Sequence, residues 1–176
     1  MKKLLFAAIL AAIMGIAGTA IADDAAATPY IAWEAQFTGQ DAIGLVPEGI
    51  RLDVYVSGVV TDGLLVGAVA NGVDYLLVRH DGVVVIDARY FVADTDGVTV
   101  AITLKGFAGE PSPGVMQAIL DPEFEPPDVD IAIHGAAWLH TMAPRFGFLN
   151  HTVFAFTGTV NQAEGVVRVT CRPLAP

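Results

Sequence analysis

Hydrophobic and polar residues alternate along most of this chain. Hydrophobic and polar residues follow each other at nearly every position from Arg51 to Val60, and again from Val98 to Lys105. Successive side chains of a β-strand point to opposite faces of a sheet, so a period of two is typical of strands with one buried face. No window of useful length shows the spacing of an amphipathic helix. The pattern therefore predicts an all-β protein.

Tight turns separate these alternating runs. Asp62-Gly63, Asp81-Gly82 and Asp96-Gly97 each place a Gly where a turn needs positive φ, behind an Asp that can cap the turn. Such turns join antiparallel neighbours, and closing the sheet removes its exposed edges. We therefore expect a single antiparallel up-and-down β-barrel of about eight or nine strands. The predicted strands are 30–38, 51–60, 64–70, 73–79, 83–92, 98–105, 131–141, 151–160 and 166–172.

Two features of the sequence indicate that the predicted barrel has packing partners in addition to its own core. Both faces of the strand 83–92 are apolar, which a lumen on one side and a packed loop or a subunit interface on the other would satisfy. The segment from Gly106 to Asp130 is rich in Pro and acidic residues, so it is predicted to be a long loop with one helical turn around 115–120. We expect this loop to cap a pocket, with a homo-oligomer as the alternative way to cover the outer face.

The N-terminus has the three parts of an export signal. Lys2 and Lys3 precede an apolar run, and Ala20-Ile21-Ala22 forms a small-residue cleavage site ahead of two acidic residues. The expected organisation is a signal peptide at 1–22, a disordered leader at 23–29 and the barrel at 30–176. We therefore predict a periplasmic or secreted protein without membrane insertion after signal cleavage.

Charge and cysteine content narrow the range of partners and chemistry. The chain has 9 Lys and Arg against 19 Asp and Glu, a formal net charge of −10. Such a surface repels phosphate backbones, so nucleic acid is not expected as a partner. Cys171 is the only cysteine, which excludes an internal disulfide. Its position among alternating valines predicts a buried, inert thiol.

Several segments resemble a bacterial family of small β-barrel proteins known as domain of unknown function 3237. They are Gly72-Val73-Asp74-Tyr75, Asp87-Ala88-Arg89-Tyr90 and the run from Pro144 to Asn150, together with Phe154 and Gly158. The resemblance covers nearly all of the chain after the signal. It implies a small β-barrel similar in type to the calycin and allene-oxide-cyclase barrels, without implying an activity. Lys105 and Phe148 stand where the family commonly has Asn and Trp.

Asp87 and Arg89 are the first candidates for chemistry. They lie two residues apart, so they share one face of a strand that is otherwise apolar. A charged pair on such a face is costly unless the partners satisfy each other or line a wet cavity. One interpretation is a structural ion pair that ties neighbouring strands together. The other is a catalytic pair in the lumen, an acid with a cation that orients the substrate.

The remaining candidates are predicted to bind ligand. Asp74 and Tyr75 follow a predicted turn at Asn71-Gly72, and Asn150 opens a predicted strand, so all three would lie at the mouth of the barrel. The alternatives are that Asp74 caps the turn and that Asn150 satisfies loop backbone groups. The segments that resemble the family add the last of the ligand-binding candidates: Tyr90, Lys105 and Phe148.

Metal and cofactor sites are not expected. His134 and His140 share a strand face, but they would stand roughly 20 Å apart and cannot hold one ion together. The acidic residues of the Pro-rich segment lack the Gly and the distal Glu of a calcium loop. No phosphate loop or dinucleotide fingerprint is present.

These observations support three hypotheses for function. The first is binding of a small apolar or aromatic molecule in the barrel, with acid–base chemistry of an isomerase, cyclase or lyase that needs no cofactor. The second is a non-catalytic periplasmic carrier with the same pocket. The third is a structural subunit of an oligomer. The sequence does not decide whether the protein is an enzyme.

Overall fold

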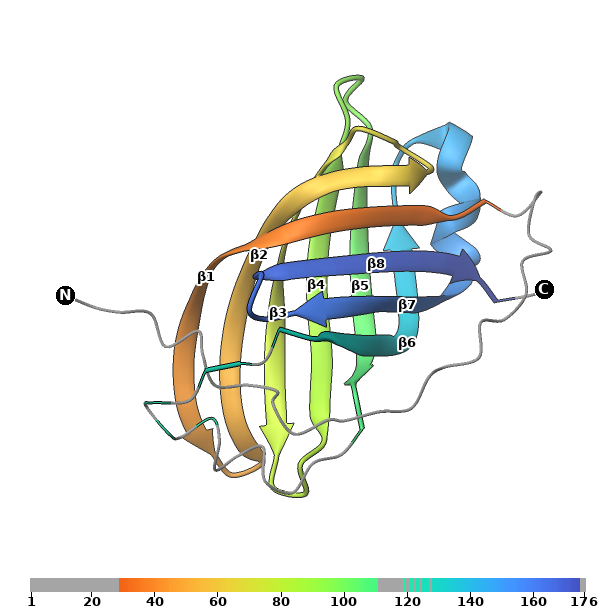
Figure 1. Ribbon diagram of the computed structural model, residues 1–176. Coiled ribbons are helices and arrows are strands. Elements are labelled where there is room, and N and C mark those ends of the chain that lie inside the picture. Colours follow the sequence, from red (N-terminus) through yellow and green to blue (C-terminus); the bar gives the residue numbers. More distant parts are fainter. Residues whose placement is uncertain are drawn as a thin grey trace.

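The protein is a closed antiparallel β-barrel, shown in Figure 1. The computed structural model describes residues 29–110, 119, 121, 123, 125–126 and 128–174. Each strand pairs with its neighbour in the chain, and β1 closes the barrel by pairing with β8. The strands are β1 Ile31–Val46, β2 Gly49–Gly63, β3 Val69–Arg79, β4 Val84–Ala93, β5 Thr99–Ala108, β6 Asp130–His140, β7 Val153–Asn161 and β8 Val166–Pro173.

The predicted fold class is confirmed, and the two largest differences in strand boundaries concern β3 and β1. The predicted strands 64–70 and 73–79 are in fact a turn followed by the single strand β3, and Gly72 lies inside that strand. Three residues of the turn have positive φ, Gly63 at 79°, Leu65 at 62° and Gly67 at 86°. Strand β1 also continues far beyond the predicted residue 38, and it forms a hairpin with β2 through Val46 and Gly49.

Strand β1 is bent, and only its first half closes the barrel. Its pairing with β2 shifts register at three points, between Ala32 and Trp33, Phe37 and Gly39, and Ala42 and Gly44. Such bulges bend a strand and increase its twist. The pairing of β1 with β8 ends at Gln36 opposite Val166. One further bond, from the Phe37 N–H to the Gly165 carbonyl at 2.7 Å, follows this pairing. Among the described residues, the second half of β1 then pairs as a strand only with β2.

The interior is solid at one end of the barrel. Large side chains from several strands are fully buried there, among them Trp33, Ile102, Leu139 and Phe154. The helix η1, Pro144–His151, connects β6 to β7 beside this end in Figure 1, and its Leu149 is buried in the core. The sequence pattern missed this short helix because its hydrophobic residues follow no helical period.

Candidate functional site

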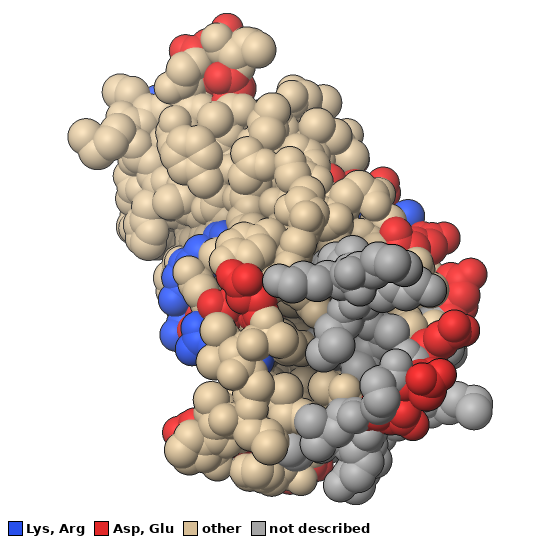
Figure 2. Space-filling model, turned by 90° about the vertical axis from the view of Figure 1, so that its left-hand side faces the viewer, with Lys and Arg blue, Asp and Glu red and all other residues tan. Residues whose placement is uncertain are grey.

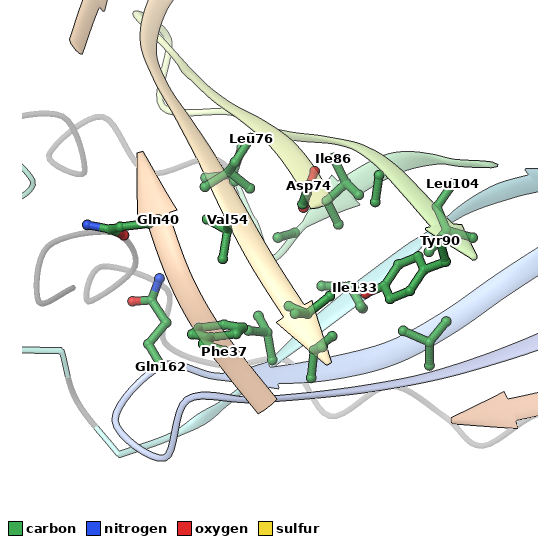
Figure 3. A pocket seen from close by; sticks show the side chains of 17 residues that line it. Phe37, Gln40, Val54, Asp74, Leu76, Ile86, Tyr90, Leu104, Ile133 and Gln162 are labelled. Atoms are coloured by element: carbon green, nitrogen blue, oxygen red, sulfur yellow. The ribbon is translucent and has the colours of Figure 1, made fainter. Parts of the chain in front are cut away.

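The other half of the barrel encloses a cavity. The centre of a water molecule can occupy about 80 Å³ of it. Because one buried water needs roughly 10–15 Å³ by this measure, the space corresponds to several waters or to one small organic molecule. Figure 3 shows the lining side chains. They are mostly aliphatic, and every strand contributes: Phe37, Gln40, Val54, Val56, Asp74, Leu76, Val84, Ile86, Ala88, Tyr90, Leu104, Ala108, Ile133, Val160, Gln162, Val167 and Val169.

Asp74 is the only carboxylate among the described residues of this lining. It lies in the middle of β3, where it is opposite Val54 on β2 and Ala88 on β4. The β3–β4 pairing is interrupted directly beyond Asp74 and resumes at Leu77 opposite Val85. In this gap the backbone N–H of Asp87 donates to Asp74 Oδ1 at 3.0 Å. Asp74 Oδ2 makes no hydrogen bond to a described residue.

Burial raises the pKa of Asp74 to about 7 from its usual 3.8. The Asp87 amide lowers this pKa by bonding to the carboxylate, while the charges of Asp87 and Asp53 raise it. Desolvation is the largest of these effects because the surrounding lumen is apolar. Asp74 therefore exchanges a proton near neutral pH, as a general acid or base must.

Tyr90 is the second polar group deep in the lumen. Its ring meets the Trp33 ring edge to face, with 5.0 Å between ring centroids. Gly72, opposite it on β3, makes room for this ring: a Cβ on Gly72 would lie 2.7 Å from Tyr90 Cδ1. Burial, together with the charge of Asp74, raises the pKa of Tyr90 above its usual 10.0, so the hydroxyl keeps its proton.

Amide side chains mark the other side of the cavity. Figure 3 shows Gln40, Gln162 and Phe37 grouped away from Tyr90. Gln40 belongs to the half of β1 that has no β8 partner, and Gln162 follows the end of β7. Gln162 Oε1 is buried and makes no hydrogen bond to a described residue. We take this side, where the described residues show no β1–β8 strand pairing, as the mouth of the cavity.

Two described residues of the Pro-rich acidic segment lie against the barrel. Ile119 is buried in the core cluster, and Asp128 Oδ1 accepts a hydrogen bond of 2.8 Å from Asn161 Nδ2, next to Gln162. The predicted helical turn at 115–120 falls, apart from Ile119, outside the described residues. These two contacts anchor the described part of the segment near the mouth.

The structure places Asp87 and Arg89 on the outer face of β4, so the prediction of a lumenal pair is wrong. Arg89 Nη1 donates to Asp87 Oδ1, and Lys105 Nζ on β5 lies 3.6 Å from Asp87 Oδ2. Their side chains are 36%, 43% and 56% exposed for Asp87, Arg89 and Lys105. The structural interpretation, an ion pair that ties neighbouring strands, describes this geometry. Since β4 is apolar on both faces, its sequence pattern could not say which face turns inward.

Lys105 and Tyr75 also face outward, which corrects their assignment as ligand-binding residues, in the case of Tyr75 at the mouth of the barrel. Arg51 Cζ lies 5.2 Å from the centroid of the Tyr75 ring, and Arg51 Nε donates to Asp53 Oδ1 at 3.0 Å. Figure 2 shows basic side chains gathered in one patch with acidic ones beside them, below a wide area without charge. The outer-face carboxylates of Asp53 and Asp87 are thus paired with basic neighbours.

Asn150 and Phe148 belong to η1 rather than to the cavity. Asn150 Nδ2 donates to the Thr141 carbonyl at 3.0 Å, and Asn150 Oδ1 accepts from the Thr141 amide at 2.8 Å. Asn150 therefore satisfies backbone groups, the structural alternative considered above. Phe148 packs, partly buried, against the core at the solid end.

Three sequence candidates remain: Cys171, His134 and His140. Cys171 is fully buried, and burial raises the pKa of its thiol. His134 and His140 are exposed on the outer face of β6. Within the part of the chain that the structure describes, no three His, Cys, Asp or Glu residues are grouped to hold a metal ion. No helix among the described residues is long and apolar enough to cross a membrane.

The fold and the site together define a small closed β-barrel with an apolar internal cavity. The chain belongs to the family of proteins of unknown function DUF3237, whose model matches residues 27–172. No curated protein is significantly similar to it in sequence.

Three solved structures share the fold. A conserved protein of unknown function from Rhodopseudomonas palustris is 19% identical, with a TM-score of 0.61 over 82% of this chain and 96% of its own. A protein of unknown function from Clostridium acetobutylicum ATCC 824 is 18% identical, with a TM-score of 0.67 over 84% and 97%. A β-barrel-like protein from Acinetobacter baumannii AYE is 19% identical, with a TM-score of 0.61 over 84% and 95%.

Proposed function

We propose that this protein binds a small, mostly apolar organic molecule inside its barrel. The observation that carries the proposal is the cavity itself, whose aliphatic wall holds a few polar groups at defined places. Ligand sites in proteins commonly combine such a wall with a small number of polar groups that orient the ligand. The hollow half of the barrel and the solid half are built from the same strands, so the cavity is a feature of the fold and not a gap between domains.

A second candidate function is proton-transfer chemistry on the bound molecule. It is favoured by Asp74, because its pKa near 7 lets one side chain both give and take a proton at neutral pH. Isomerisation, cyclisation and elimination need no more than such a group in a dry pocket. Asp74 replaces Asp87 and Arg89 as the group that would do this chemistry. An Asp74→Asn variant that still binds ligand but loses turnover would separate an enzyme from a carrier.

We also propose that the protein works in the periplasm or outside the cell. The support comes from Lys2 and Lys3, the apolar run and Ala20-Ile21-Ala22. In that setting a carrier or enzyme for small hydrophobic molecules would meet its ligand without a membrane crossing.

The proposal is tested by filling the cavity. Val54 and Val59 lie on the same strand, but Val54 lines the lumen and Val59 is 48% exposed on the outer face. Toluene is the probe, and its binding is followed by two-dimensional NMR of the protein and by the rise in melting temperature. We expect Val54→Phe to abolish binding and Val59→Phe to leave it unchanged. The milder Val54→Ile, which weakens binding without overpacking, guards against a folding defect. Equal binding by all four proteins would place the toluene site outside the barrel and contradict the proposal.

A further inference from the structure

We infer that the lumen takes an uncharged one-ring molecule with a carbonyl group, whose oxygen accepts hydrogen bonds from the Asp74 carboxylic acid and the Tyr90 hydroxyl. The inference rests on the proposed function and narrows its ligand class. It depends on where the two polar side chains lie, on their capacity to donate, and on the absence of other charge in the cavity lining.

The strand register brings the two groups together. Tyr90 is opposite Gly72 and Ala88 is opposite Asp74, so Asp74 and Tyr90 are diagonal neighbours on the inner face of β3 and β4. Diagonal neighbours in a sheet have Cα atoms roughly 7–8 Å apart, within reach of an aromatic side chain. Both side chains belong to the lining of the same cavity, which Figure 3 shows. One small ligand can therefore contact both.

Each of the two groups has a hydrogen-bonding atom left for a ligand. Asp74 Oδ1 already accepts the Asp87 amide, which leaves Oδ2 without a partner among the described residues. An unpaired carboxylate is costly in an apolar lumen, and the raised pKa of Asp74 keeps the protonated form populated up to about pH 7. Tyr90 keeps its proton as well. The cavity thus offers two O–H donors, and a carbonyl oxygen has two lone pairs to accept from them.

Among the described lining residues, Asp74 is the one charged group. Asp53 on β2 and Asp87 on β4 raise the pKa of Asp74 from the outer face, and Asp87 is itself paired with Arg89 and Lys105. The part of the lining that the structure describes contains no Lys, Arg or His. A ligand carboxylate would therefore lack a counter-ion, whereas a neutral carbonyl is matched. A carboxylic acid next to a tyrosine hydroxyl is a known arrangement for binding a carbonyl or enolate oxygen in an apolar site.

Two probes of nearly the same shape test this inference. Acetophenone carries a carbonyl group where α-methylstyrene carries a C=CH₂ group. Their dissociation constants are measured on the full-length mature protein at pH 5.5 and pH 8.5. Only the protonated fraction of Asp74 donates, and apparent affinity scales with the competent fraction. With a pKa of about 7, we expect acetophenone to lose roughly 30-fold in affinity at the higher pH, while α-methylstyrene changes little.

Two variants complete the test. In Asp74→Asn the amide oxygen can still accept the Asp87 N–H while its NH₂ group donates, so acetophenone should bind equally at both pH values. In Asp74→Leu the preference for acetophenone should fall to what the Tyr90 hydroxyl alone supplies and should no longer depend on pH, while α-methylstyrene still binds, which shows that the cavity is intact. If α-methylstyrene binds but the ratio of the two affinities depends neither on pH nor on residue 74, the inference is wrong and the proposed function stands. If neither probe binds the wild type, both fail.

Discussion

The backbone amide of Asp87 donates a hydrogen bond to the side chain of Asp74, with 3.0 Å between Asp87 N and Asp74 Oδ1. This contact fills the one gap in the β3–β4 pairing. The side chain of Asp87 lies on the outer face of the barrel, whereas its amide bonds to the carboxylate of Asp74 in the lumen. The lumenal acid is thus held by the backbone of the wall and not by another side chain, which leaves its second oxygen for a ligand.

The first prediction concerns stability and pH. Because the pKa of Asp74 is raised from 3.8 to about 7 on folding, the folded protein holds this proton more tightly than the unfolded chain. The stabilising effect of protonation is fully present below pH 3.8 and is lost as pH rises to about 7, by at most about 1.4 kcal/mol per pH unit. Asp74→Asn cannot ionise, so its free energy of unfolding relative to wild type should increase between pH 4.5 and 7.5.

Urea unfolding at a series of pH values measures this difference. Asp96→Asn is the control, because the Asp96 side chain is exposed on a turn away from the cavity. Parallel pH profiles for wild type and Asp74→Asn would show that Asp74 titrates as an ordinary exposed carboxylate.

The second prediction concerns the outer ion pair. Asp87 and Arg89 are solvent-exposed, and exposed pairs contribute little to stability. Replacing Arg89 with Gln should therefore cost less than about 1 kcal/mol, against the roughly 3–5 kcal/mol expected for breaking a buried pair. Toluene binding should be unchanged. Thermal unfolding measures the change in stability, and the toluene assay measures binding. A loss of binding at unchanged stability would show that Asp87 and Arg89 belong to the functional site.

The third prediction concerns the close contact between β3 and β4. A Cβ on Gly72 would lie 2.7 Å from both the Arg89 carbonyl oxygen and Tyr90 Cδ1. Gly72→Ala should force the strands or the Tyr90 ring to shift, at a cost of about 1–3 kcal/mol, and it should weaken binding of acetophenone. Gly147→Ala in η1 is the matched control, since its Cβ would meet nothing within 4 Å. Equal melting temperatures for the two variants would contradict the prediction.

The fourth prediction concerns the N-terminus. We expect the mature protein to begin at Asp23 and to be recovered from the periplasm or the medium. N-terminal sequencing of the exported protein checks this. Recovery of an intact Met1 from a membrane fraction would contradict it.

The sequence predicted the barrel because alternation and turn chemistry are local signals. Within a few residues, runs such as 51–60 indicate strands and Asp-Gly pairs indicate turns. The order of the strands in the chain then sets which strands pair in an up-and-down barrel. The predicted turn at Asn71-Gly72 was wrong, because Asn followed by Gly usually indicates a turn whereas Gly72 lies inside β3. Here it makes room for Tyr90 from the next strand, a contact that no local pattern records.

The site was harder to predict for the same reason. Asp74 and Tyr90 were among the candidates, whereas the face of Asp87 stayed open because both faces of β4 are apolar. Gln40, Gln162 and Trp33 were not among the candidates. Gln40 lies between two predicted strands, and so does Gln162. Only the path of β1 brings both to the mouth. The packing of Trp33 against Tyr90 appears only in the structure.

The most direct test of the central claim is a crystal structure of the mature protein grown with acetophenone at pH 5.5. We expect electron density for the acetophenone ring within the hollow half of the barrel, among Val54, Ile86 and Leu104. Its carbonyl oxygen should lie within hydrogen-bonding distance of Asp74 and Tyr90. Density for the probe on the outer face alone, or a lumen closed by the protein's own side chains, would contradict it.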